Sequence, residues 1–161
     1  MSIFGERLRR CKEDRGMMAN LRCILVEDKK HRAWPVLSRL GVDVGNEVAA
    51  YVAGLYATHP EETTQGNFGA TCKRIERERN EKRSDDNKLT PTERRFQQIL
   101  ASDRHEVLER VMRMVKMAKS HGVSVNYDQL EYDLRYWSDR AKTEWAASFW
   151  TPGAAPAEED A

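Results

Sequence analysis

The sequence predicts an all-α protein made of two small helical bundles joined by a polar linker. Apolar residues recur at helical spacing along most of the chain, and capping residues precede several of these stripes. No alternating run of β-branched residues indicates a strand. With 161 residues, of which 40% are hydrophobic, the chain is long enough to bury one core or two small ones.

The first bundle is expected within residues 1–83. Residues 47–58 are apolar on every side, which is typical of a buried central helix, and His59-Pro60 ends it because the residue before proline disfavours helical backbone. A second helix is expected to begin near Asn67, since Phe68, Cys72 and Ile75 fall on one helical face.

A linker is expected at residues 84–90. The stretch before it, residues 76–83, is wholly polar, and Ser84-Asp85-Asp86-Asn87 has the composition of an exposed loop. The pattern therefore places the boundary between the two bundles here.

The second bundle is expected at residues 91–151. Thr90-Pro91-Thr92-Glu93 is a capping box with proline at the first helical position. Three further helices are expected to start after Asp103, Asn126 and Ser138. The predicted inner faces are Phe96, Ile99 and Leu100; Val107, Leu108, Val111, Met114, Val115 and Ala118; Tyr127, Leu130, Leu134 and Trp137; and Ala141, Trp145 and Phe149. His121-Gly122 is expected to stop the second of these helices, and residues 152–161 are expected to form a disordered acidic tail.

The charge is almost balanced, at +1, but unevenly distributed. Residues 1–83 carry 16 Lys and Arg against 12 Asp and Glu, residues 84–150 carry 11 of each, and residues 151–161 contribute −3. Any nucleic-acid binding must therefore come from local patches. The chain starts without an apolar signal segment and has no run long enough for a membrane span, so a cytoplasmic protein is expected.

The sequence lacks the signatures of an enzyme. Its four histidines are scattered, its three cysteines have no C-x-x-C spacing, and neither a G-x-S-x-G nor a phosphate-binding glycine loop is present. We expect no catalytic residue, metal or cofactor, and free thiols at Cys11, Cys23 and Cys72. Gly66-Asn67-Phe68-Gly69 is interpreted as a turn before a helix, with Gly69 allowing close packing.

Two groups of basic residues are candidates for nucleic-acid contact. The first, around Lys73 and Arg74, is interleaved with glutamates, which favours a solvated helix end with i, i+4 ion pairs over a nucleic-acid contact. The second lies between Arg94 and Lys119, where seven cations oppose three carboxylates. A basic strip on packed helices can follow a phosphate backbone, although Glu106 and Glu109 interrupt it and a plain solvated face remains the alternative.

An ordered series of short motifs runs through nearly the whole chain. It includes Leu21-Arg22, Trp34-Pro35, Leu55-Tyr56-Ala57, Phe68-Gly69, Pro91-Thr92-Glu93-Arg94-Arg95-Phe96, Ser102-Asp103-Arg104, Tyr127-Asp128-Gln129-Leu130, Leu134-Arg135-Tyr136-Trp137 and Arg140-Ala141-Lys142. In this order the motifs resemble the small subunit, often called CasB, of the type I-E CRISPR Cascade complex.

The resemblance implies a non-catalytic subunit of a crRNA-guided antiviral complex. Its implied partners are the repeated backbone subunit, the large subunit, a second copy of itself in a head-to-tail row, the crRNA-containing complex and the displaced non-target DNA strand. The implied role is to hold that strand and stabilise the R-loop while the guide RNA reads the sequence. The alternative is a helical protein-interaction scaffold without direct nucleic-acid contact.

The resemblance also points to particular residues. Arg22, Arg94, Arg95, Arg104, Arg113 and Arg140 match basic positions of the family, whereas Cys23, Met112 and Ala70 stand where basic residues are common. Together with the composition, this gives the nucleic-acid-binding candidates Arg22, Lys73, Arg74, Arg94, Arg95, Arg104, Arg110, Arg113, Lys116, Arg140 and Lys142.

Overall fold

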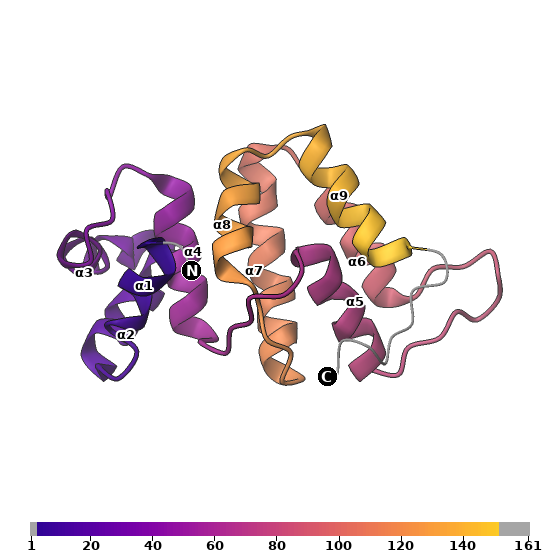
Figure 1. The fold of residues 1–161 in the computed structure, drawn as a ribbon, viewed down its shortest axis with the longest axis horizontal. Helices are drawn as coiled ribbons and strands as arrows, with labels where there is room; N and C mark the ends of the chain where they lie inside the picture. Colours follow the sequence, from indigo (N-terminus) through magenta and orange to yellow (C-terminus); the bar gives the residue numbers. More distant parts are fainter. Residues whose placement is uncertain (1–2, 152–161) are drawn as a thin grey trace.

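Helices make up most of residues 3–151, the part of the chain that the computed structural model describes (Figure 1). The elements are α1 (Ile3–Arg9), α2 (Arg15–Arg22), the 3₁₀ helices η1 (Cys23–Leu25) and η2 (Glu27–Arg32), α3 (Trp34–Arg39), α4 (Glu47–Thr58), α5 (Phe68–Glu78), α6 (Pro91–Leu100), α7 (Arg104–Ser120), α8 (Tyr127–Arg135) and α9 (Asp139–Trp150). Within the described residues, β-pairing is limited to one isolated bridge, between Glu62 and Val125. The predicted all-α class is confirmed.

The capping residues begin the helices where the sequence predicts. Thr90 and Glu93 form a full capping box at α6, and Asp103 and Glu106 form another at α7. The side chains of Asn67, Asn126 and Ser138 cap α5, α8 and α9. At the end of α7, Gly122 adopts a φ of +67°, which glycine tolerates at no steric cost. These helix starts are fixed locally, because each cap satisfies an otherwise unpaired backbone N–H.

Helix α4 is the buried helix of the N-terminal part, as its all-round apolar sequence predicts. Residues from Ala49 to Ala57 are buried apart from Tyr51, which is half-buried. The helix packs against α2 and η1 on one side and against α8 and α7 on the other. Gly54 permits the approach of α2 and η1, because a Cβ at this position would collide with the Ile24 side chain.

The other half of the molecule is built from α5, α6, α7 and α9. Helix α5 packs most closely against α9 and also against α6 and α7 (Figure 1). The sequence assigned residues 68–78 to the first bundle, but their packing places α5 beside the C-terminal helices. The reason is tertiary: the buried face of Phe68, Cys72 and Ile75 is covered partly by aromatic residues of α9, with Phe68 and Trp145 ring centroids 5.3 Å apart.

The beginning of the segment between α5 and α6 is tied to the first turn of α6. Glu81 accepts hydrogen bonds from the backbone N–H and hydroxyl of Thr92, both at 2.9 Å, and Arg83 pairs with the buried Glu93 at 2.6 Å. Between these contacts, residues 84–88 are exposed. The division into bundles at 84–90 stays a prediction, and the acidic tail predicted at 152–161 lies outside the described residues.

Helix α8 joins the two halves through its contacts with α4. The Tyr127 hydroxyl donates to the His59 carbonyl, and a ring nitrogen of His59 lies 2.7 Å from the Val123 carbonyl. Both side chains are buried. Among residues 3–151, no helix combines the length and apolar character that crossing a bilayer requires.

Candidate nucleic-acid interface

A groove of about 240 Å³ between α6 and α7 brings together three of the predicted cations. It is lined by Arg95 and Gln98 of α6 and by Arg110 and Arg113 of α7, with Ile99, Met114 and Met117 at its base. None of these lining residues is acidic. The packing of α6 on α7 therefore gathers guanidinium groups that the sequence separates by up to 18 positions.

The two helices present these arginines because their apolar stripes face inward. Phe96 and Ile99 turn one face of α6 to the core, and Val107, Val111 and Val115 do the same for α7. Arg95 and Arg113 occupy the outward faces and are exposed. The two capping boxes fix where each helix starts, and so which residues face outward.

Arg110 is held by its own chain. Its Nη1 donates to the Gln98 carbonyl at 3.1 Å and to the Ser102 hydroxyl at 2.7 Å, and its Nη2 lies 3.8 Å from Glu106. These bonds tie α7 to the last turn of α6. Arg110 therefore shapes the groove as well as contributing charge.

Arg113 makes only a weak internal ion pair. Its guanidinium lies 3.5 Å from Glu109, and the side chains are 67% and 64% exposed. Solvent screens such a pair, and exposed pairs contribute about 0.2–1 kcal/mol. A phosphate arriving at the groove can replace Glu109 at little cost.

Three of the predicted cations are exposed and lie beyond ion-pair distance of every carboxylate in residues 3–151. They are Arg95, Arg104 and Lys116. Arg104 is the first residue of α7, and Lys116 lies one turn beyond Arg113 on the same helix. The predicted basic strip is therefore present as exposed charge, interrupted by Glu106 and Glu109 as the sequence indicated.

The remaining candidates do not join this groove. Lys73 pairs with Glu76 at 3.1 Å on α5 and lies over the Phe149 ring, and Arg74 is half-buried on the same helix. Arg94 donates to the Leu89 carbonyl at 2.7 Å, beside the start of α6. On α9, Arg140 pairs with Glu144 at 2.9 Å and Lys142 lies over the Trp137 ring.

Arg22 belongs to a second basic groove that the sequence analysis missed. This groove, of about 440 Å³, is lined by the cations Lys12, Arg15, Arg22 and Lys119 together with Met18, Ala57, Thr58 and Pro60. Arg22 donates to the Ala57 carbonyl at 2.9 Å, which sets it across the end of α4. Helical periodicity carried no signal for this cluster, because its members come from α2, the turn before it and the far end of α7.

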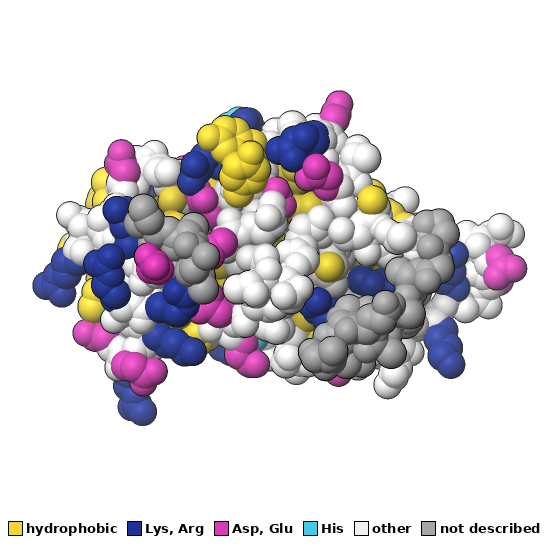
Figure 2. Space-filling view, in the orientation of Figure 1, with side chains coloured by type: hydrophobic (Ala, Val, Ile, Leu, Met, Phe, Trp, Pro, Cys, Tyr) yellow, Lys and Arg dark blue, Asp and Glu magenta, His cyan; other side chains and the backbone are white. Residues whose placement is uncertain are grey.

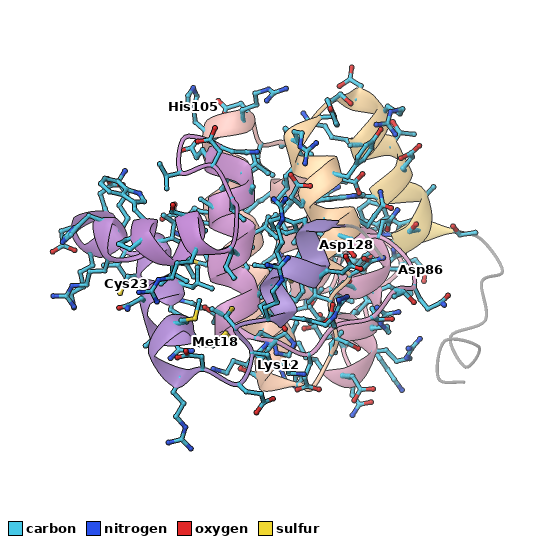
Figure 3. The ribbon with its side chains drawn as sticks, turned by 60° about the vertical axis from the view of Figure 1, so that its left-hand side comes forward. Lys12, Met18, Cys23, Asp86, His105 and Asp128 are labelled. Atoms are coloured by element: carbon cyan, nitrogen blue, oxygen red, sulfur yellow. The ribbon has the colours of Figure 1, made fainter. Side chains whose placement is uncertain are left out.

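The second basic groove lies at one edge of the molecule. In Figure 3, Lys12 and Met18 mark the second basic groove near the lower edge, whereas His105 lies at the upper end near the start of α7. Figure 2 shows Lys and Arg side chains interspersed with Asp and Glu over the face in view, in keeping with a net charge of +1. Positive charge is therefore concentrated in local clusters such as this groove, and it does not cover the whole face in view.

Within the described part of the chain, potential metal ligands are dispersed and two of the three thiols are buried. No group of three or more His, Cys, Asp or Glu side chains in residues 3–151 is placed to hold a metal ion. Cys11 and Cys72 are buried, and burial raises the pKa of both thiols, strongly so for Cys72. A raised pKa keeps a thiol protonated and so lowers its reactivity as a nucleophile.

The tryptophan and tyrosine side chains divide between core and surface. Trp137 and Trp145 are buried and pack against one another at a tilt, with ring centroids 4.9 Å apart and an interplanar angle of 57°. Trp34, Tyr132 and Tyr136 are exposed, and none of them lines either basic groove.

Comparison with known proteins identifies the family. The sequence profile described as CRISPR-associated protein Cse2 matches residues 7–150. No curated protein sequence matches the chain closely enough to count as a relative.

Solved structures share the fold. A CRISPR-associated protein of the Cse2 family from Thermus thermophilus superimposes with a TM-score of 0.72 at 19% identity, covering 91% of this chain and 94% of that one. A structure of CasB, also from Thermus thermophilus, gives 0.68 at 19% identity over 91% and 94% of the two chains. CasB from M. ruber gives 0.68 at 19% identity over 98% and 93%.

The profile match extends over the ordered motifs from Leu21-Arg22 to Arg140-Ala141-Lys142, so the resemblance drawn from them is confirmed. The chain belongs to the CRISPR-associated protein Cse2 family.

Proposed function

We propose that this protein is the non-catalytic small subunit of a type I-E Cascade complex, where it binds the displaced DNA strand and stabilises the R-loop. Family membership supports a CRISPR Cascade subunit. The α6–α7 groove, with three arginines and no lining carboxylate, is the observation that supports the DNA contact. The other Cascade subunits and a second copy of the chain are its proposed partners.

The groove suits a phosphate backbone. Guanidinium groups bind phosphate oxygens in bidentate geometry, and each phosphate neutralised releases a condensed counterion. Arg95 and Arg113 project from rigid helices, and Arg104 and Lys116 extend the positive charge along α7. The groove offers no aromatic ring for base stacking, and we expect its arginines and Gln98 to contact the backbone, which carries no sequence information.

The proposed role follows from the physics of strand exchange. The RNA–DNA heteroduplex is about as stable as the DNA duplex that it replaces, so protein contacts to the backbone decide whether the R-loop persists. A subunit that holds the displaced strand prevents it from re-annealing with the target strand. It needs neither sequence specificity nor a reaction of its own.

The second candidate is a protein-interaction scaffold without direct DNA contact. One observation favours it: Arg110, Arg140 and Lys73 all make hydrogen bonds or ion pairs with their own chain. In this alternative the cations stabilise the fold or meet acidic surfaces of partner subunits.

The experiment removes the exposed charge and leaves Arg110 in place. The triple variant Arg95→Ala, Arg104→Ala, Arg113→Ala is assembled with the other Cascade subunits, and retention of target DNA is measured against salt concentration. Assembly should be unchanged and DNA retention weaker. If the three side chains contact phosphates, the slope of log K against log salt should become smaller by about 2.

The matched control removes the same charge elsewhere. Arg39→Ala, Lys82→Ala, Lys88→Ala takes away three exposed cations that do not line the α6–α7 groove. Its salt slope should stay close to that of the unaltered protein. Equal slopes for both triple variants and the unaltered protein would favour the scaffold.

A further inference from the structure

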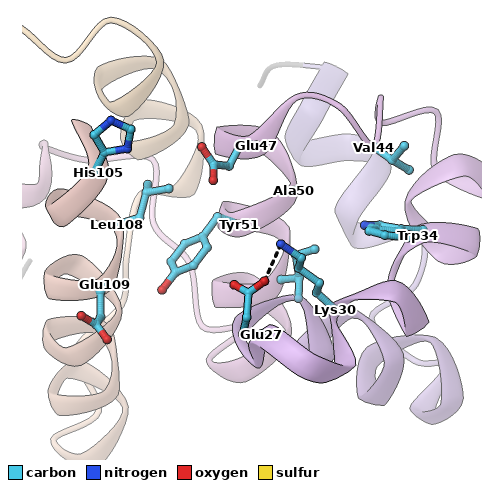
Figure 4. Close-up of a pocket in the computed structure, with 11 residues that line it drawn as sticks. Glu27, Lys30, Trp34, Val44, Glu47, Ala50, Tyr51, His105, Leu108 and Glu109 are labelled. Atoms are coloured by element: carbon cyan, nitrogen blue, oxygen red, sulfur yellow. Dashed lines mark ion pairs between the residues drawn. The ribbon is translucent and has the colours of Figure 1, made fainter.

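A third cavity, of about 350 Å³, lies between the N-terminal part of the chain and α7 (Figure 4). In the close-up, Trp34 and Val44 stand on one side, and Leu108 and Glu109 of α7 on the other, with Tyr51 of α4 between them. Neither basic groove shares any of its lining residues.

The cavity is acidic. Three carboxylates line it, from Glu27, Glu47 and Glu109, against a single ammonium group, that of Lys30. Lys30 is already paired with Glu27 at 2.7 Å. With the His105 imidazole counted as uncharged, the lining has a net charge of −2.

Among the three carboxylates, Glu47 is the one that forms no ion pair with a cation of the described residues. It is exposed in the first turn of α4, and no cation of residues 3–151 lies within ion-pair distance of it. Glu109 has only its screened pair with Arg113. Two of the three carboxylates can therefore accept hydrogen bonds from an incoming cation.

The same cavity exposes apolar surface. Trp34 is 42% exposed and Val44 is 46% exposed, and both are large hydrophobic side chains. The Tyr51 hydroxyl is held 3.4 Å from the Met112 sulfur, and burial, reinforced by the Glu109 charge, raises the pKa of Tyr51 to about 12. Tyr51 therefore remains neutral and offers a ring face without adding charge.

This combination selects the class of ligand. Carboxylates beside aromatic rings bind guanidinium or ammonium groups through ion pairs and cation–π contacts. A phosphate backbone would be repelled by the net charge. A metal ion is disfavoured too, because the carboxylates do not converge as a metal-binding cluster within the described residues.

We propose that this cavity is the docking site for an arginine or lysine side chain of a protein partner, whose neighbouring aliphatic side chain packs on Trp34 and Val44. The cation lies between Glu47 and Glu109, and charge complementarity determines the occupant. The proposal goes beyond the DNA contact and rests on the proposed assembly into a multi-subunit complex.

The isolated chain tests the chemistry of the cavity directly. Acetyl-leucyl-arginine amide is titrated into the protein while the indole N–H signal of Trp34 is followed by NMR, with acetyl-leucyl-glutamate amide as the acidic counterpart. The arginine peptide should shift this signal saturably and the glutamate peptide should not. Glu47→Gln should abolish the shift, whereas Glu6→Gln should preserve it, since Glu6 is an exposed glutamate in the first turn of α1.

Co-purification with the other Cascade subunits tests the docking role. The double variant Glu47→Gln, Trp34→Ala should lower the fraction of this chain retained in the complex by at least about fivefold, with single-stranded DNA binding by the isolated chain unchanged. Glu109 is left intact, because its partner Arg113 lines the proposed DNA groove.

The outcomes separate the two proposals. Equal shifts from both peptides, or a shift that survives Glu47→Gln, would overturn the cationic docking site. Full retention of the double variant would overturn its role in assembly. Failure of the unaltered chain to enter any complex would instead overturn the proposed function, while the peptide titration still decides the cavity.

Discussion

At the scale of single residues, Glu93 shows how one carboxylate can connect three segments. It accepts hydrogen bonds from the Thr90 backbone N–H at 2.8 Å, from Arg83 at 2.6 Å and from the Trp150 indole at 2.8 Å. The side chain is only 3% exposed. The start of α6, the loop before it and the end of α9 therefore meet at this group.

These donors make the charged form of Glu93 the stable one. The Arg83 guanidinium contributes most, opposed by burial, and the pKa of Glu93 falls from 4.5 to about 2. Because the folded pKa lies below the unfolded one, the stabilisation is complete above pH 4.5 and is lost as the pH falls toward 2.

Glu93→Gln should therefore destabilise the protein in a pH-dependent way. The loss in the free energy of unfolding should be on the order of 3 kcal/mol at pH 7 and about 2 kcal/mol smaller at pH 3. Urea unfolding of both proteins between pH 3 and pH 7 gives this difference. A constant difference across the range would contradict the assigned role of the charge.

At the scale of elements, the contact between α5 and α9 depends on a glycine. A Cβ at Gly69 would collide with the backbone carbonyl of Trp145 on α9. Because the obstacle is backbone, it cannot rotate away as a flexible side chain would. The interpretation of Gly69 as a close-packing glycine is thus supported by the geometry.

Gly69→Ala should force α5 and α9 apart. We expect a loss of at least about 2 kcal/mol in the free energy of unfolding, because overpacking against backbone cannot be relieved locally. Thermal and urea unfolding measure it.

Gly16→Ala serves as the matched control. It lies in α2, where the nearest heavy atom to an added Cβ is 3.5 Å away. This substitution should be neutral or stabilise the helix by up to about 1 kcal/mol, since alanine is the better helix former. If Gly69→Ala lowers the free energy of unfolding no more than Gly16→Ala does, the α5–α9 contact accommodates the added methyl group.

At the scale of the whole molecule, α4 and α8 connect the two groups of helices. Tyr127 is 2% exposed, its ring meets Tyr56 edge-on at 5.6 Å, and its hydroxyl donates to the His59 carbonyl. Burial raises the pKa of Tyr127 well above its ordinary value, so this hydroxyl stays a donor.

Tyr127→Phe should weaken this connection without changing the packing volume. The expected loss in the free energy of unfolding is about 1–2 kcal/mol, since a buried carbonyl loses its partner. Because both groups share this interface, far-UV circular dichroism and tryptophan fluorescence should report the same shifted midpoint. Two separate midpoints would show that the groups unfold independently.

Tyr132→Phe is the matched control, because Tyr132 lies on the same helix and is 47% exposed. Its effect should stay within about 0.5 kcal/mol, as for other surface substitutions.

From residue 47 onward, the helices follow from the amino-acid pattern alone. Thr90, Asp103, Asn126 and Ser138 cap helices where the pattern predicted, and the stripes of α7 and α9 are buried as expected. These features are local, since a cap and its stripe lie within a few turns. The short helices before residue 47 were not delimited, because several are 3₁₀ helices or have too few turns to show a period.

Where these helices meet depends on contacts that local patterns do not specify. Arg95, Arg104, Arg113 and Lys116 were predicted as exposed cations, but the chain alone could not show that Arg95 and Arg113 share a groove or that Arg110 is bound to Ser102. Nor could it place α5 beside α9, or Lys119 beside Arg22. Periodicity records which face of a helix is buried, whereas the partner of that face depends on packing between segments far apart in the chain.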